Sequence, residues 1–409
     1  MNTSRIIMHI DFNSYFASVE QQANPFLRGK AIGVGGKPGT RSIVATASIE
    51  AKRQGVKTAM ASSEAVKILP ELQMIDGDAR KYSEMTERFM NIYKRHAGVV
   101  EQFSIDEAFL DVTNECEDWM DAIAIALRIR EEIKNEIGSY TTASIGIAPN
   151  KLVAKIASES DKPHGVTVVY PDEVEAFLDN RELSDVPGIG FAILRRLEEM
   201  GISKISQLRE APFSTLASFK QYGHFLYNAA RGKDNSPVSD VAEKPKSVGH
   251  SYTLPFDTDS PEVLRATLLH LADKVAWRLR KHGLVARSYS AVVRFESMSF
   301  SSSMGRFDAP TNEGFKIFNG AWSKVSPLLH RDKIRLVGVS ARDLVPVHEQ
   351  VSTDKKESKR TKLLPALDKI QHRYGSGSWL RASELMAVKL KERSNGFFFD
   401  HIGESNKAY

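Results

Sequence analysis

The sequence predicts a multidomain protein in which an α/β domain and a smaller α+β domain flank a helical segment. In residues 1–170, strand-like and helix-like stretches alternate, as expected for a sheet covered by helices. Residues 171–233 are mostly helix-like, and the polar, proline-containing residues 234–246 read as a linker. Residues 247–345 then follow the order β-α-β-β-α-β.

Hydrophobic periodicity places the elements of the first domain. Strands are expected at residues 5–11, 30–34, 42–48 and 141–148, and two more within 98–112 that meet near Ser104. Helices are expected from residue 14, at 64–69 before Pro70, at 79–96, and at 122–138 with Gly138 as its cap.

The later elements follow from the same patterns. Residues 185–201, "DVPGIGFAILRRLEEMG", place a tight turn before a helix that Gly201 can end. Pro261 opens a helix whose apolar face carries Leu264, Leu268, Leu271, Val275 and Leu279. Strands are expected at 247–253, 288–295, 299–307 and 333–341, a second helix at 312–329, and a polar tail at 346–409 with one amphipathic piece at 363–374.

Composition excludes several classes of protein. A single cysteine, Cys116, rules out an internal disulfide and fits a reducing compartment. No secretory signal is apparent, and no stretch approaches the roughly 20 apolar residues of a membrane span. We therefore expect a cytoplasmic protein with no membrane partner.

The net charge of +5 is unevenly distributed. Residues 244–345 hold 16 lysines and arginines against 9 aspartates and glutamates, a balance of +7, so the rest of the chain carries −2. A basic module on a slightly acidic body is typical of nucleic-acid binding, although a solvated surface could show the same clustering.

Three carboxylates occur in strand-like settings: Asp11, and the adjacent pair Asp106 and Glu107 in "FSIDEAFLDV". An unpaired buried carboxylate costs several kcal/mol, so a positive partner is expected for each. Each acid alone could simply pair with a lysine or arginine. Together, convergent carboxylates form an oxygen-only site suited to two Mg²⁺ ions, with Mn²⁺ as a possible substitute, and to phosphoryl chemistry.

Four stretches, "HIDFNSYFASVE", "SIDEAFLDV", "SIGIAPNKLVAKIASESDKPHG" and "VPGIG", resemble the signature stretches of the Y-family DNA polymerases, most closely the DNA polymerase IV (DinB-like) group. The resemblance extends in order from about residue 5 to about residue 345. It implies a right-hand polymerase: a palm at 1–170 with fingers inserted at about 21–79, a thumb at 171–233, and a little finger at 247–345. It also implies low-fidelity translesion synthesis without proofreading, in DNA repair after damage.

The resemblance assigns roles to individual residues. Asp11, Asp106 and Glu107 match the catalytic acids that hold the metals, and the main-chain carbonyl of Phe12 completes one metal site. Phe16 matches the steric gate that excludes ribose, although its spacing alone would suit a core aromatic residue. Further matches for nucleotide binding are Tyr15, Thr46, Lys52 and Lys162.

The chain departs from the family pattern in the fingers. Where many relatives have Tyr and Arg, this chain has Ile49 and Lys52. Lysine keeps the positive charge but lacks the guanidinium fork, and isoleucine can only pack, so weaker nucleotide binding is expected.

DNA contacts are expected from the turn and the basic module. The "GIG" of Gly188 and Gly190 resembles a helix-hairpin-helix turn that can receive a phosphate, although any helix–helix turn may carry this sequence. Within the basic module, Lys246, Arg294 and Arg335 are the candidates. The expected partners are primer–template DNA and deoxynucleoside triphosphates, bound by a monomer.

Two other readings compete with an active polymerase. A DNA-binding accessory protein of the same fold would be expected to lack the metal acids, and all three are present. A nucleotidyl cyclase would also use carboxylates and two metals, but it has no need of a thumb turn or a basic module.

Polymerases of this group commonly bind the sliding clamp through a Gln-Leu-x-Leu-Phe-like peptide beyond the little finger. Here the corresponding stretch reads "EQVSTDKKE": Gln350 is present, but Thr353 and Asp354 stand where Leu and Phe would be. We therefore expect the peptide 345–356 not to bind the clamp, and a chain ending at Val345 still to extend primers.

Overall fold

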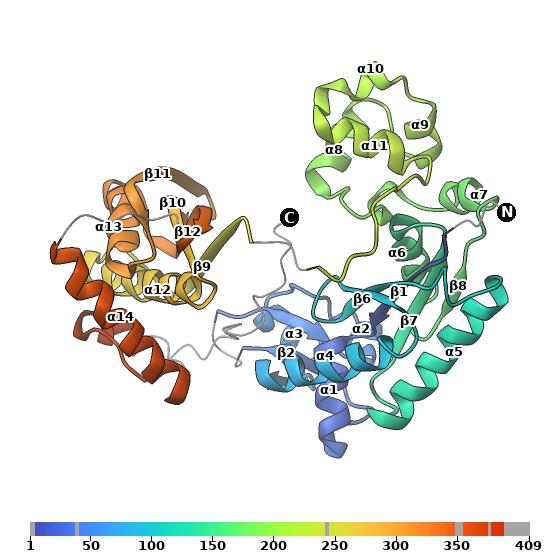
Figure 1. Cartoon of the computed structure of the whole chain (residues 1–409), viewed down its shortest axis with the longest axis horizontal. Helices are drawn as coiled ribbons and strands as arrows, with labels where there is room; N and C mark the ends of the chain where they lie inside the picture. Colours follow the sequence, from blue (N-terminus) through green and yellow to red (C-terminus); the bar gives the residue numbers. More distant parts are fainter. Residues whose placement is uncertain (1–4, 37–40, 242–244, 348–354, 375–377, 388–409) are drawn as a thin grey trace.

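The computed structural model describes residues 5–36, 41–241, 245–347, 355–374 and 378–387. The chain forms a large α/β body, a small helical unit and a separate C-terminal sheet with its helices (Figure 1). Within the described residues, no helix is both long and apolar enough to cross a membrane.

The body is built on a five-stranded sheet with the order β5-β6-β1-β7-β8. Its strands are β1 Ile7–Phe12, β5 Val99–Gln102, β6 Glu107–Asp111, β7 Ala143–Ala148 and β8 Val166–Val168. The central strand β1 is antiparallel to both β6 and β7, which brings distant parts of the sequence together. The four strands predicted here are confirmed, and β8 is an addition.

The two faces of this sheet are covered differently, because successive side chains of a strand point to opposite faces. Met8, Ile10 and Phe12 face the core formed with α1 Tyr15–Ala23, α4 Ala79–Tyr93 and α5 Trp119–Glu136. Ile7 packs on the other face with α6 Lys151–Ser160. His9 and Asp11 share the face of Ile7 by the same alternation.

Gly146 in β7 determines how closely α6 approaches the sheet. A Cβ at this position would lie 2.0 Å from the carbonyl oxygen of Ala154 and 2.4 Å from the amide nitrogen of Ser158. Only glycine therefore allows this packing. The close approach places the polar residues of α6 against those of β1.

A second, three-stranded sheet extends from the body in the order β3-β2-β4. It contains β2 Ile32–Gly35, β3 Val44–Ala47 and β4 Gln73–Asp76, with α2 Ile49–Arg53 and α3 Ser62–Ile68. The strands β2 and β3 confirm the prediction, whereas β4, which pairs in parallel with β2, was not predicted.

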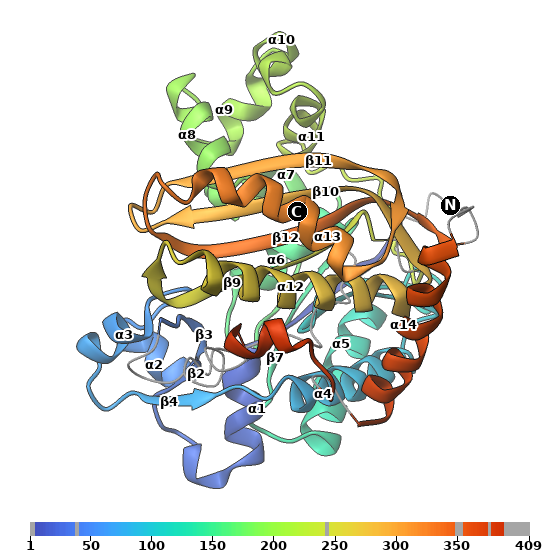
Figure 2. The same ribbon diagram turned by 90° about the vertical axis from the view of Figure 1, so that its left-hand side faces the viewer.

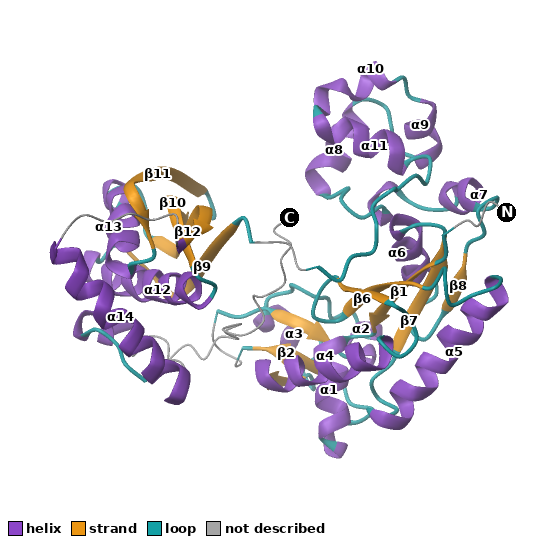
Figure 3. Cartoon of the chain, in the orientation of Figure 1, coloured by secondary structure: helices purple, strands orange, loops and turns teal. Residues whose placement is uncertain are grey.

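The small unit is helical, as expected, and Figure 3 draws it as helices and loops alone. Its elements are α7 Val174–Asp179, α8 Phe191–Glu199, α9 Ile205–Glu210, α10 Phe213–Leu216 and α11 Gln221–Ala229. After α8 the backbone at Gly201 has φ +78°, the left-handed conformation expected for a residue that ends a helix.

The segment that follows is anchored to the body. The Arg5 guanidinium donates to the carbonyl oxygens of Asp234 (2.8 Å) and Ser236 (3.0 Å), and the backbone N–H of Ser239 donates to Glu101 Oε2 (3.1 Å). Residues 234–239, the first part of the predicted linker, are thus hydrogen-bonded to the α/β body.

The C-terminal unit confirms the predicted order β-α-β-β-α-β. Its antiparallel sheet has the order β11-β10-β12-β9, formed by β9 Ser247–Thr258, β10 Leu284–Phe295, β11 Phe300–Thr311 and β12 Ile334–Pro346. Helices α12 Pro261–Lys281 and α13 Gly314–Val325 pack on one face of it, which is turned toward the viewer in Figure 2. The other face carries the exposed Arg294.

The tail is not separate from this unit. Helix α14, Lys355–Tyr374, begins before the predicted start at Leu363. Three pairs join the tail to α12: Asp368 with Arg280, Arg381 with Asp273, and Glu384 with His270. These side-chain pairs hold the described residues 363–374 and 378–387 of the tail to α12.

Candidate active site

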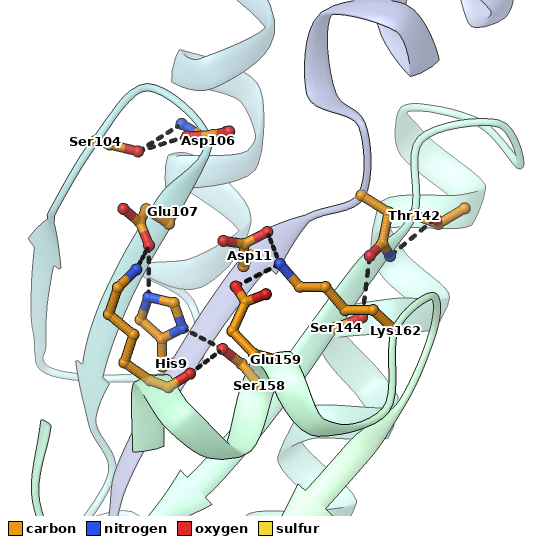
Figure 4. Close-up of polar contacts among 12 residues, drawn as sticks. His9, Asp11, Ser104, Asp106, Glu107, Thr142, Ser144, Ser158, Glu159 and Lys162 are labelled. Atoms are coloured by element: carbon orange, nitrogen blue, oxygen red, sulfur yellow. Dashed lines mark hydrogen bonds and ion pairs between the residues drawn. The ribbon is translucent and has the colours of Figure 1, made fainter. Parts of the chain in front are cut away.

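The three acids lie close together at one end of the five-stranded sheet (Figure 4). Asp11 in β1 stands directly opposite Glu107, the first residue of β6. Asp106 lies in the turn before β6, so the prediction that it sits inside a strand is wrong. The turn forms because the backbone N–H groups of Phe103 and Ser104 both donate to the carbonyl oxygen of Glu107. The backbone N–H of Phe12 donates to the carbonyl oxygen of Asp106 (3.0 Å), which ties this turn to β1.

Asp11 is held by a lysine from the loop after α6. Lys162 Nζ donates to Asp11 Oδ1 (2.9 Å) and to Glu159 Oε1 (2.6 Å). Burial raises the pKa of Asp11 to about 6; Lys162 opposes this shift, and the Asp106 carboxylate adds to it. The structure therefore brings Lys162, predicted from the sequence, to the acids.

Glu107 has two partners that were not predicted. His9 Nε2 lies 2.9 Å from Glu107 Oε2, and Lys155 Nζ forms an ion pair with the same oxygen. Burial acts to raise the pKa of Glu107, but the His9 hydrogen bond and the charge of Lys155 outweigh it and lower the pKa to about 2. The expectation of a positive partner for each acid is confirmed for Asp11 and Glu107. The sequence does hold one indication that His9 belongs to the site. His9 precedes Asp11 by two residues in a strand, so the two side chains lie on the same face of the sheet.

Asp106 is oriented by its own turn. The Ser104 hydroxyl donates to Asp106 Oδ1, and the backbone N–H of Asp106 donates to Ser104 Oγ (3.3 Å). Burial raises the pKa of Asp106, and the neighbouring Glu107 carboxylate adds to the shift.

The donor set suits a hard divalent cation. Among the described residues, Asp11 Oδ2, Asp106 Oδ2 and Glu107 Oε1 have no hydrogen-bond or ion-pair partner. Half-buried carboxylates of like charge with free oxygens are groups that Mg²⁺ or Mn²⁺ would stabilise. In this side-chain arrangement the described residues hold no ready-made group of three His, Cys, Asp or Glu side chains around one point. Cation binding would therefore require the acids to draw closer.

Tyr15 and Phe16 belong to an aromatic cluster under the site. The Tyr15 hydroxyl donates to the carbonyl oxygen of Tyr82 (2.7 Å), so this side chain is engaged in the core. Any contact of Tyr15 with a nucleotide would have to come from its backbone. The Phe16 ring is 9% exposed and lies 4.5 Å from the Tyr82 ring, a position that suits both a core residue and a gate.

Of the other nucleotide-binding candidates, Lys52 in α2 interacts with Asp11 through charge. Burial lowers the pKa of Lys52, the charge of Lys162 lowers it further, and Asp11 opposes the shift. Lys162 pairs directly with Asp11, and the charge of Lys52 also acts on it. The Thr46 hydroxyl in β3 donates to the carbonyl oxygen of Ala45 (2.9 Å), and Ile49 opens α2.

The Gly188 and Gly190 turn has the predicted form. Gly188 has φ +100°, and a Cβ there would lie 2.6 Å from the hydroxyl of Tyr222, which donates to the Gly188 carbonyl oxygen. Gly190 is the N-cap of α8, and a Cβ there would meet no atom within 4 Å. Phe191, the first residue of α8, is 80% exposed.

The candidates in the basic module differ in their surroundings. Lys246 and Arg294 are exposed. Arg335 lies 3.6 Å from Asp257, which also accepts two hydrogen bonds from Arg41 of the three-stranded unit (2.5 and 2.7 Å). Arg335 is thus already paired with a carboxylate. Residues 348–354, at the centre of the clamp-peptide prediction, lie outside the described residues.

Comparisons with known proteins agree along most of the chain. Residues 10–159 match the impB/mucB/samB family, residues 245–354 match its C-terminal domain, and residues 184–234 match the thumb domain of DNA polymerase-iota. The chain is 36% identical over 378 residues to DNA polymerase IV of Dehalococcoides mccartyi, covering 91% of this chain and 96% of that protein. It is 34% identical over 353 residues to DNA polymerase IV of Listeria monocytogenes, covering 85% of this chain and 98% of that one.

Solved structures give the same result. A Y-family DNA polymerase chimera of Dbh and Dpo4 superposes with a TM-score of 0.73 at 30% identity, covering 83% of this chain and 99% of the chimera. The insertion ternary complex of Dbh DNA polymerase superposes with a TM-score of 0.56, also at 30% identity, covering 83% of this chain and 99% of that one.

Proposed function

Because the chain belongs to the Y family of DNA polymerases and is a DNA-directed DNA polymerase of the DinB-like, translesion type, we propose that it extends primers by a two-metal mechanism centred on Asp11, Asp106 and Glu107. The observation that carries this proposal is the placement of three half-buried carboxylates at one end of the sheet, with Lys162 paired to Asp11 and Lys155 paired to Glu107.

Within this proposal, the three carboxylates and the main-chain carbonyl of Phe12 hold the divalent cations. The cations supply Lewis-acid activation of the primer oxygen and neutralise charge on the leaving pyrophosphate. The protein residues supply position: β1 fixes Asp11 opposite Glu107, and the Ser104 turn fixes Asp106 beside them.

Lys162 and Lys52 are then available for the triphosphate of the incoming nucleotide. In this structure Lys162 neutralises Asp11, and we expect it to exchange that contact for phosphate oxygens when a nucleotide enters. Lys52 offers a point charge rather than a bidentate fork, and Ile49 offers no hydrogen bond. We therefore expect a raised KM for nucleotides with the chemical step intact.

Phe16, packed on Tyr82, is our candidate for sugar selection. The thumb turn at Gly188 and Gly190 and the exposed Lys246 and Arg294 are the proposed sites of contact with the DNA backbone. Since we recognise no exonuclease segment in the sequence, we propose synthesis of low fidelity without proofreading.

Primer extension tests the proposal. Wild-type protein with Mg²⁺ and four deoxynucleotides should extend a primed template, and Asp106→Asn, which keeps the shape of the side chain and removes its charge, should abolish extension. DNA affinity should stay within a few-fold. Asp172→Asn, at an exposed aspartate, serves as the matched control and should be fully active.

The same assay covers the alternative of a weak or inactive DNA-binding accessory protein. The departures at Ile49 and Lys52 are the observation that favours it. Wild-type protein that binds primer–template but adds no nucleotide would establish this alternative in place of the proposal.

A further inference from the structure

His9 is a polar side chain in a wholly buried place, with 0% of its surface exposed. It lies in β1 between Phe109 of β6 and Gly146 of β7, and its ring packs 4.5 Å from the Phe109 ring. Both ring nitrogens have partners: Nδ1 lies 2.7 Å from Ser158 Oγ, and Nε2 lies 2.9 Å from Glu107 Oε2. Figure 4 shows this chain of contacts leading from α6 through His9 to the acid.

The protons in this chain can be assigned by counting donors. An ionised Glu107 only accepts hydrogen bonds, so Nε2 of His9 must carry the proton that the two groups share. Burial lowers the pKa of His9, and the hydrogen bond to Glu107 opposes this shift. The Ser158 hydroxyl lies 2.7 Å from Nδ1 and donates to the carbonyl oxygen of Lys155 (2.8 Å), so it links the His9 ring to the backbone of α6.

Both partners of Glu107 use the same oxygen. His9 and Lys155 contact Oε2, and among the described residues Oε1 has no partner. The Glu107 carboxylate is thus held through Oε2 alone, and Oε1 is left without a partner among the described residues. Contacts confined to Oε2 fix the orientation of the carboxylate and leave Oε1 available to a cation.

The two partners differ in rigidity. The Lys155 side chain is 19% exposed, and its ammonium group lies at the end of a flexible chain of methylene groups. The His9 side chain, by contrast, is fully buried. The position of the His9 ring depends on the close approach of α6 to the sheet, which Gly146 permits. This approach places Ser158 within hydrogen-bonding distance of the ring.

We propose that His9 is a positioning residue that holds Glu107 by Oε2 and so presents Oε1 to a divalent cation. This inference rests on the proposed metal-dependent function. A role as a core side chain alone would place no demand on the donor at Nε2. That difference makes the inference testable apart from stability.

The test is Mn²⁺ binding to the full chain, followed by the electron paramagnetic resonance signal of the free ion. His9→Leu should weaken binding about 10- to 100-fold, the usual effect of losing an outer partner of a metal ligand. His9→Gln, whose amide can donate to Oε2, should stay within a few-fold of wild type. His96→Leu is the matched control, since His96 Nε2 also lies 2.9 Å from a glutamate, Glu132, at a site outside the catalytic group.

The outcomes distinguish a failure of the proposed role of His9 from a failure of the proposed metal site. Wild-type protein whose Mn²⁺ binding is absent, or is unaffected by Asp106→Asn, would remove the proposed metal site itself. Wild-type binding that His9→Leu leaves unchanged would overturn the role of His9 alone. Should His9→Leu fail to fold by thermal melting, Ser158→Ala decides: weaker binding than wild type supports the chain of contacts, and equal binding overturns it.

Discussion

Arg381→Ala tests whether the C-terminal segment is part of the little finger. Arg381 Nε donates to Asp273 Oδ2 (2.6 Å) and its Nη2 to Oδ1 (3.3 Å), between the Arg280–Asp368 and His270–Glu384 pairs. Burial raises the pKa of Asp273 to about 6, even though Arg381 opposes the shift. Removing the guanidinium would leave this half-buried carboxylate without its cation.

The expected cost follows from these contacts. A hydrogen bond to a charged group contributes about 1.5–3 kcal/mol to stability. The Arg381 side chain is 33% exposed, so solvent screens part of the interaction, and we expect a loss near the lower end, about 1.5–2 kcal/mol.

Urea unfolding of the full chain, followed by tryptophan fluorescence, measures this loss. Trp277 and Trp322 lie in the little finger and Trp379 in the C-terminal segment, so three of the four tryptophans report on this unit. Arg373→Ala on the exposed side of α14 is the control. Adding Asp273→Asn to Arg381→Ala should recover part of the lost stability, because the unpaired charge is then gone.

A change below about 0.5 kcal/mol for Arg381→Ala, equal to that of the control, would refute the reasoning. Such a result is typical of exposed ion pairs, which contribute little. The result also bears on the chain ending at Val345. That truncation removes these contacts and the last residue of β12, so we expect it to extend primers with a less stable little finger.

Three further predictions concern the α/β body and the binding of DNA by the C-terminal unit. Phe16→Val should raise ribonucleotide incorporation relative to deoxynucleotide in single-turnover assays; unchanged selection with a lower melting temperature would make Phe16 a core residue only. Arg294→Ala should reduce the slope of log affinity against log salt by about one unit on any DNA sequence, and an unaltered slope would place the DNA contacts elsewhere. Gly146→Ala should cost about 1–3 kcal/mol of unfolding free energy, because its Cβ would overlap α6. Gly98→Ala, whose Cβ would meet only a side-chain oxygen at 3.3 Å, should cost less, and equal losses would contradict the packing argument.

Much of the fold was predictable because its elements have clear local patterns. The alternation of Tyr289, Ala291, Val293 and Phe295 places four side chains on the buried face of β10, as their burial confirms. The helical spacing from Leu264 to Leu279 likewise marks the buried face of α12. The acids could be singled out because carboxylates are unusual in such apolar surroundings.

What the sequence did not reveal depends on contacts between distant residues. Strands β4 and β8 are short, and each joins its sheet through parallel pairing with one strand distant in the sequence, β2 for β4 and β7 for β8. The partnership of His9 with Ser158 requires α6 to lie on β1, and no local pattern shows this. The docking of the tail likewise depends on three polar side chains spaced along α12 and three on a segment about a hundred residues later.

The central claim is that this chain copies a template, and single-nucleotide insertion tests it most directly. Each of the four deoxynucleotides is offered separately opposite each of the four template bases, with Mg²⁺ and a defined primer. The account predicts fastest insertion of the complementary nucleotide opposite every base, with measurable misinsertion and no excision of the mismatched end. Insertion that ignores the template base, or none at all by protein that binds the primer–template, would contradict it.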